Sequence, residues 1–62
     1  MTNEAQRRSI LVNLSRIGGQ VRGIRKMVEE PRLCTDILQQ LAAAQASLSR
    51  VSSNVLKFHV EV

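Results

Sequence analysis

The chain has 62 residues, 44% of them apolar and a single aromatic, Phe58, so it forms at most one domain, residues 1–62, with an aliphatic core. Its apolar runs are too short for a membrane span or a signal peptide, and its single cysteine cannot form an intrachain disulfide, which favours a cytoplasmic protein. The formal net charge of +4 favours a polyanionic partner.

Apolar residues recur at alternating spacings of three and four in two segments, which predicts two helices with heptad seams. The first seam is Ile10, Leu14, Ile17, Val21, Ile24 and Val28, and the second is Cys34, Ile37, Leu41, Ala44, Leu48, Val51, Val55 and Phe58. Proline is favoured at the first position of a helix and disfavours helix before it. We therefore expect the first helix to end near Glu29 and the second to begin at Pro31, with Thr2 or Asn3 capping the first.

Two long helices joined by a short turn must fold back on each other, which predicts an all-α antiparallel hairpin. Further apolar residues flank both seams and would stay uncovered in one hairpin: Leu11, Val12, Met27, Leu38, Ala42 and Leu56. Pairing two hairpins into a four-helix-bundle dimer would cover most of them.

Three glycines, Gly18, Gly19 and Gly23, lie inside the first predicted helix, where each costs about 1 kcal/mol relative to alanine. A kink or a close approach of a neighbouring helix would explain them. The alternative is a helix backbone exposed for contact with phosphate.

Six of the nine basic residues lie in the first predicted helix, and the segment from Ala5 to Val28 contains no acidic residue. They are Arg7, Arg8, Arg16, Arg22, Arg25 and Lys26. A basic helix without acidic residues suits a phosphate backbone, since counterion release drives such binding. The alternative is a solvated face that keeps the protein soluble. The chain has no aromatic platform for single strands and no zinc-finger pattern, so we expect duplex DNA.

Cys34 and His59 are 25 residues apart, which places them on the same face of the second helix but about 37 Å apart along it. One chain cannot bring them to a shared ion, whereas two antiparallel copies can, with a two-fold axis between Ala46 and Ser47. A thiolate and an imidazole suit Cu(I), and Zn(II) or Ni(II) less well with so few ligands. The alternative is a purely structural role, with Cys34 as a small buried thiol and His59 as a structural histidine. No catalytic constellation is present, so an enzyme is not expected.

Two stretches resemble the copper-sensing transcriptional repressors of the CsoR/RcnR type. Residues 14–24, LSRIGGQVRGI, resemble the family signature L-x-R-I-E-G-Q-V-x-G-I, and residues 34–41, CTDILQQL, resemble its C-x-D-[IV]-L-x-Q-[IL] stretch. The 25-residue step to His59 is also the family's step.

The resemblance implies antiparallel four-helix dimers that assemble into a homotetramer, and operator binding by the metal-free tetramer. It also implies an effector site shared between Cys34 of one chain and His59 of another, with Arg16 and Arg22 matching the DNA face. We therefore expect a Cu(I)-responsive repressor. A formaldehyde or persulfide sensor of the same family, and a helical assembly module that does not bind DNA, are the alternatives.

The chain departs from the family pattern at several positions. Gly18 replaces the signature glutamate, Gln45 stands where many members carry arginine, and Leu33 replaces a tyrosine frequent in copper sensors. Members usually continue past His59 with a short third helix, and copper sensors place a second cysteine one turn after it. The C-terminal short helix is therefore expected to be missing from residues 1–62.

Overall fold

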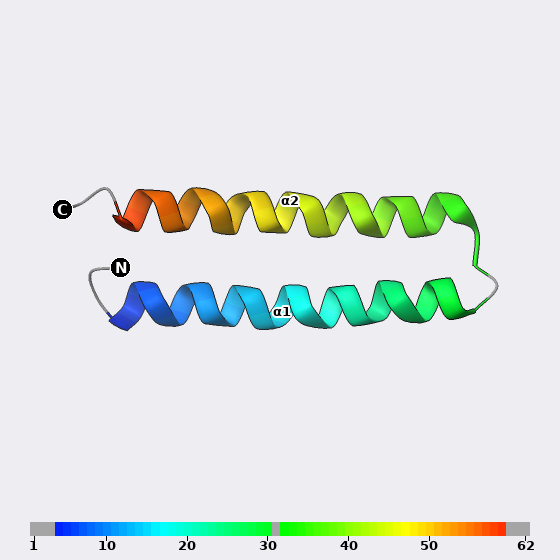
Figure 1. Cartoon of the computed structure of the whole chain (residues 1–62), viewed down its shortest axis with the longest axis horizontal. Helices are drawn as coiled ribbons and strands as arrows, with labels where there is room; N and C mark the ends of the chain where they lie inside the picture. The colour runs from blue at the N-terminus through cyan, green and yellow to red at the C-terminus, as the bar shows by residue number, and fades with distance from the viewer. Residues whose placement is uncertain (1–3, 31, 60–62) are drawn as a thin grey trace.

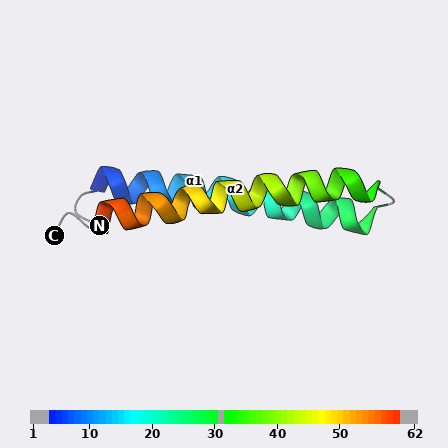
Figure 2. The ribbon, with the colours of Figure 1, turned by 90° about the horizontal axis from the view of Figure 1, so that it is seen from above.

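The protein folds into two antiparallel helices of equal length. The computed structural model describes residues 4–30 and 32–59, in which α1 spans Glu4–Glu29 and α2 spans Cys34–His59, each with 26 residues. The helices lie side by side along their whole length, so that the start of α1 and the end of α2 meet at one end of the hairpin (Figure 1 and Figure 2). The described residues contain no strand. The predicted all-α hairpin is confirmed.

The connection between the helices is longer than predicted. The Glu30 amide donates to the Lys26 carbonyl at 3.0 Å and closes the last turn of α1. At the other end of the connection, the amides of Asp36 and Ile37 donate to the Leu33 carbonyl at 3.0 and 3.2 Å. The hydrogen bonding of α2 therefore begins after Leu33, and the predicted start at residue 31 is wrong by three residues. Pro31 itself and the proposed caps, Thr2 and Asn3, lie outside the described residues.

Only one of the two heptad positions in each predicted seam is buried between the helices. The buried residues follow one another at intervals of seven: Ile10, Ile17 and Ile24 in α1, and Ala44 and Val51 in α2, all at most 8% exposed. Phe58 continues this row and packs against the core cluster that Ile10, Ile17 and Val51 form. The other seam position is exposed: Leu14, Val21, Val28, Leu41, Leu48 and Val55 have 36–64% of their surface accessible. The seam is thus confirmed for half of its residues.

The glycines of α1 do not interrupt the helix, and α2 does not pack closely against them. The helix runs through all three, and no glycine in the described chain has a positive φ. A methyl group added at Gly18 or Gly19 would meet only the Arg22 side chain within 4 Å, and one added at Gly23 would meet nothing. The expected close approach of a neighbouring helix is therefore absent within the hairpin, whereas the expected kink stays a prediction.

The hairpin is a thin slab that exposes more surface than its mass predicts. Its principal extents are 48 × 16 × 10 Å and its accessible surface is 4956 Å². A folded monomer of this mass typically exposes about 4000 Å². Neither helix is both long and apolar enough to cross a membrane in the part of the chain that the structure describes.

Candidate functional site

The hairpin has an apolar face made of exposed seam residues, each four positions after a residue of the inward-facing row, in which Ile37 is half-buried. This face consists of Leu14, Val21, Val28, Leu41, Leu48 and Val55. Side chains four residues apart on a helix are neighbours on its surface, so each row runs beside the buried row along its helix. In an antiparallel pair these two rows fall on the same side of the slab. The apolar face therefore extends over both helices and faces away from the hairpin's own core.

Cys34 lies at one end of this apolar face. It is the first residue of α2 and stands seven residues before Leu41, in the same heptad row. Its thiol is free and the residue is exposed. A cysteine that served only as a small core hydrophobe would be buried in the hairpin, so this alternative does not hold for the single chain.

His59 is the last residue of the same helix, since α2 runs without interruption from Cys34 to His59. The two residues are therefore separated by the full length of α2, about 37 Å at 1.5 Å per residue. Within the described ranges, the chain holds no group of three His, Cys, Asp or Glu side chains that could bind a metal ion. One hairpin thus separates the two predicted ligands. A metal ion held by both Cys34 and His59 would therefore need donors from more than one chain.

The six basic residues predicted to bind DNA all lie on α1 but do not share one environment. Arg7 forms an ion pair with Glu4 at 3.3 Å, and Arg25 forms one with Glu29 at 3.1 Å. Each of these arginines is thus partly neutralised by an acid just outside the segment that lacks acidic residues.

The other four predicted residues have no acidic partner. Arg8, Arg22 and Lys26 have no ion pair in residues 4–30 and 32–59. Arg16 donates from Nη2 to the Asn13 amide oxygen at 2.6 Å, a neutral acceptor that leaves its charge available. These four are the stronger candidates for phosphate contact.

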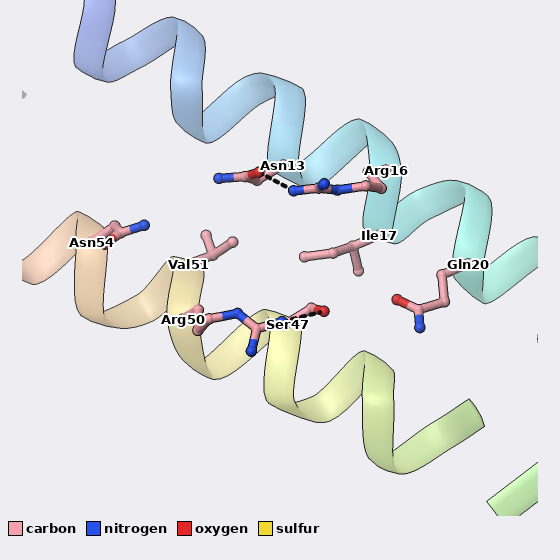
Figure 3. Close-up of a pocket in the computed structure, with 8 residues that line it drawn as sticks. All are labelled: Asn13, Arg16, Ile17, Gln20, Ser47, Arg50, Val51 and Asn54. Carbon is pink, nitrogen blue, oxygen red and sulfur yellow. Dashed lines mark hydrogen bonds between the residues drawn. The ribbon is translucent and has the colours of Figure 1, made fainter. Parts of the chain in front are cut away.

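A polar cleft runs between α1 and α2 on the side opposite the apolar face. Its volume is about 440 Å³, and Figure 3 shows the eight residues that line it: Asn13, Arg16, Ile17, Gln20, Ser47, Arg50, Val51 and Asn54. Its polar walls come from asparagine, glutamine and serine side chains that lie three residues after buried residues. The leucines and valines of the apolar face lie one position further along each helix. No carboxylate is among the lining residues, so the cleft is a basic, hydrogen-bonding groove.

Arg50 is the cleft residue that the sequence interpretation missed. It reaches the cleft from α2, opposite Arg16 of α1, and its Nη2 donates to the Ser47 hydroxyl at 3.3 Å (Figure 3). The available signal was its heptad position: Arg50 directly precedes buried Val51, as Arg16 directly precedes buried Ile17. A search for clusters of basic residues within one helix could not find a pair formed across two.

Comparison with known proteins identifies the family of the chain. Residues 6–62 match the family described as metal-sensitive transcriptional repressor. The chain therefore belongs to that family, whose members are repressors rather than enzymes.

Named relatives include transcriptional repressors from several bacteria. The copper-sensing transcriptional repressor CsoR of Bacillus subtilis is 52% identical over 46 residues, which cover 74% of this chain and 46% of that protein. The copper-sensing transcriptional repressor RicR of Mycobacterium tuberculosis is 45% identical over 47 residues, covering 76% and 49%. A transcriptional repressor RcnR homolog of Escherichia coli is 39% identical over 46 residues, covering 74% and 51%.

The chain thus spans about half the length of these relatives. No solved structure matches it significantly.

Proposed function

We propose that this chain is the DNA-binding and effector-sensing unit of a cytoplasmic, metal-responsive transcriptional repressor. In the proposal the metal-free oligomer binds operator DNA, and Cu(I) ligation between subunits releases it. The observation that carries the proposal is the placement of Cys34 and His59 at the two ends of one continuous helix, with Cys34 exposed on an uncovered apolar face. Copper is named for the Bacillus and Mycobacterium relatives, which supports Cu(I) over Zn(II) or Ni(II) here.

The apolar face supports a dimer of hairpins. The accessible surface of 4956 Å² exceeds that expected for a folded monomer by about 950 Å², comparable to the roughly 800 Å² that one partner buries in a standard interface. A second copy offers matching rows of leucine and valine, so the two faces can pack as a four-helix bundle. Dimers of this kind would then pair into the homotetramer that the family resemblance implies.

The same pairing would complete the effector site. Because α2 begins at Cys34 and ends at His59, two α2 helices that overlap fully in antiparallel directions place each Cys34 beside the partner's opposite end. The thiolate and the imidazole are donors that suit Cu(I). When bound, Cu(I) would supply a coordinate link between the two subunits at each end of the α2 pair.

The opposite side of the slab would carry the DNA. Arg16 and Arg50 flank the polar cleft, and Arg8, Arg22 and Lys26 add charge along the outer edge of α1, the edge that points away from α2. Ile17 and Val51 join the two walls of the cleft through the core. A change in how two α2 helices pair is therefore passed to α1, and it alters the spacing of the basic residues against the phosphates. This coupling needs about 1–3 kcal/mol between effector and DNA.

The test uses a DNA duplex that the protein enriches from a random library. Salt or a candidate effector is titrated into the complex of protein and duplex, and fluorescence anisotropy measures the fraction of duplex bound. We expect affinity to fall steeply with salt, and Cu(I) to release the duplex without release by Zn(II) or Ni(II) at equal free concentration. Release by formaldehyde or persulfide after copper chelation, and not by Cu(I), would assign another effector. Absence of salt-dependent duplex binding would contradict the proposal and leave a helical assembly module.

A further inference from the structure

The arginines of α1 differ in what lies one helical turn away from them. Arg7 and Arg25 each have a glutamate three or four residues distant and form an ion pair with it. Arg22 has Gly18 and Gly19 at the corresponding positions on its N-terminal side, and Arg25 and Lys26 on its C-terminal side. No acidic side chain is therefore placed to neutralise Arg22 along its own helix.

The Arg22 side chain occupies the surface that the two glycines leave bare. Its Nη1 lies 3.5 Å from the position that a Cβ would take at Gly18, and its Nη2 lies 3.6 Å from that position at Gly19. Helical side chains lean toward the N-terminus over the preceding turn, so residue 18 is where a partner for Arg22 would stand. A glutamate four residues before an arginine is the favourable orientation for a helical ion pair.

The glycines have no role within the hairpin that would explain their cost to the helix. Neither approaches α2, and both have an ordinary helical φ. An alanine at Gly18 would be accommodated at ordinary contact distance from a flexible side chain. Packing and backbone conformation within the hairpin therefore do not require glycine at this position.

We propose that Gly18 is an affinity-determining position for DNA, because the missing side chain leaves the Arg22 charge unpaired and available to one backbone phosphate. This inference rests on the proposed DNA binding. Arg22 is the residue that contacts phosphate, and Gly18 acts only through it.

The experiment compares Gly18→Glu with Gly18→Gln, which has nearly the same size and no charge. Loss of one phosphate contact lowers the slope of log K against log salt by about 0.9, which corresponds to about eightfold weaker binding at 0.1 M salt for each contacting copy. We expect this loss for Gly18→Glu and near wild-type binding for Gly18→Gln. Both substitutions should raise the melting temperature, because both replace glycine within a helix.

Two controls separate a local pair from a general change of charge. Ser49→Glu adds the same charge on α2, where no basic residue lies three or four positions away, and it should leave the salt slope unchanged. In an Arg22→Ala background, Gly18→Glu should have no further effect on the slope. Equal losses for Gly18→Glu and Gly18→Gln, or a full effect of Gly18→Glu without Arg22, would overturn the inference. Failure of the unsubstituted protein to bind duplex would instead overturn the proposed function.

Discussion

The two broad sides of the hairpin are built from adjacent heptad positions that differ in polarity. Four residues after each buried position the sequence has leucine or valine, as at Leu14 and Leu48, and these residues form the apolar face. Three residues after four of the five buried positions the sequence has polar residues, as at Asn13 and Ser47, and these line the polar cleft; Met27 after Ile24 is the exception. One side thus exposes apolar side chains that the hairpin itself does not cover, while the other side presents hydrogen-bonding groups and arginines. A single helical pattern therefore places an apolar surface and a basic, hydrogen-bonding surface on opposite sides of a slab only 10 Å thick.

The largest effect is expected from a charge placed in the apolar face. Leu48→Asp would bury an unpaired carboxylate between hairpins, at a cost of about 3–5 kcal/mol, so we expect loss of the oligomer and of much of the helical signal. Sedimentation equilibrium and far-ultraviolet circular dichroism measure both. Ser49→Asp, an exposed neighbour outside that face, is the matched control and should retain assembly. An oligomer that survives Leu48→Asp would show that the subunits meet elsewhere.

Removal of the thiol at the end of the apolar face should separate sensing from DNA binding. Cys34→Ser keeps the side-chain size, so duplex affinity without effector should stay at the wild-type value. The effect of Cu(I) on that affinity, about 5–150-fold in a coupled switch, should disappear. Anisotropy titrations with and without buffered Cu(I) measure the ratio. A Cu(I) response of undiminished size in Cys34→Ser would remove this residue from the effector site.

On the opposite side, Arg50 should contribute to duplex binding although it lies on the less basic helix. Arg50→Ala removes one cation from the polar cleft, so binding should weaken about eightfold at 0.1 M salt for each contacting copy, with the salt slope reduced by about 0.9. Arg32→Ala is the matched control, since Arg32 lies in the connection and pairs with Glu30 at 3.3 Å. Equal salt slopes for the two variants would place the DNA away from the cleft.

The sequence predicted the hairpin well because periodicity records which residues face inward. It could not show that Ile17 packs within the chain while Leu14 does not, since spacings of three and four describe both rows equally. The prediction placed the start of α2 from proline's preference for the first helical position, whereas the first hydrogen bonds of α2 are accepted by the Leu33 carbonyl. Cys34 was predicted as a ligand from its spacing to His59 and stays a prediction, whereas Arg50 depends on which helix faces which across a cleft, and that requires the structure.

The smallest expected effects come from alanine substitutions on the two sides of α1, which should change the free energy of unfolding in opposite directions. Gly23 directly precedes buried Ile24 and so lies in the same heptad row as Arg16, toward the polar cleft. An added methyl group meets nothing within 4 Å there, so Gly23→Ala should raise the free energy of unfolding by about 1 kcal/mol through helix propensity. Val21→Ala, two residues away on the apolar face, should instead lower it by about 1–2 kcal/mol through lost burial between subunits. Urea unfolding at fixed protein concentration measures both changes. Their opposite signs follow only if the cleft side stays free of protein in the assembly, because a subunit packed against Gly23 would clash with the new methyl group and make that change unfavourable as well.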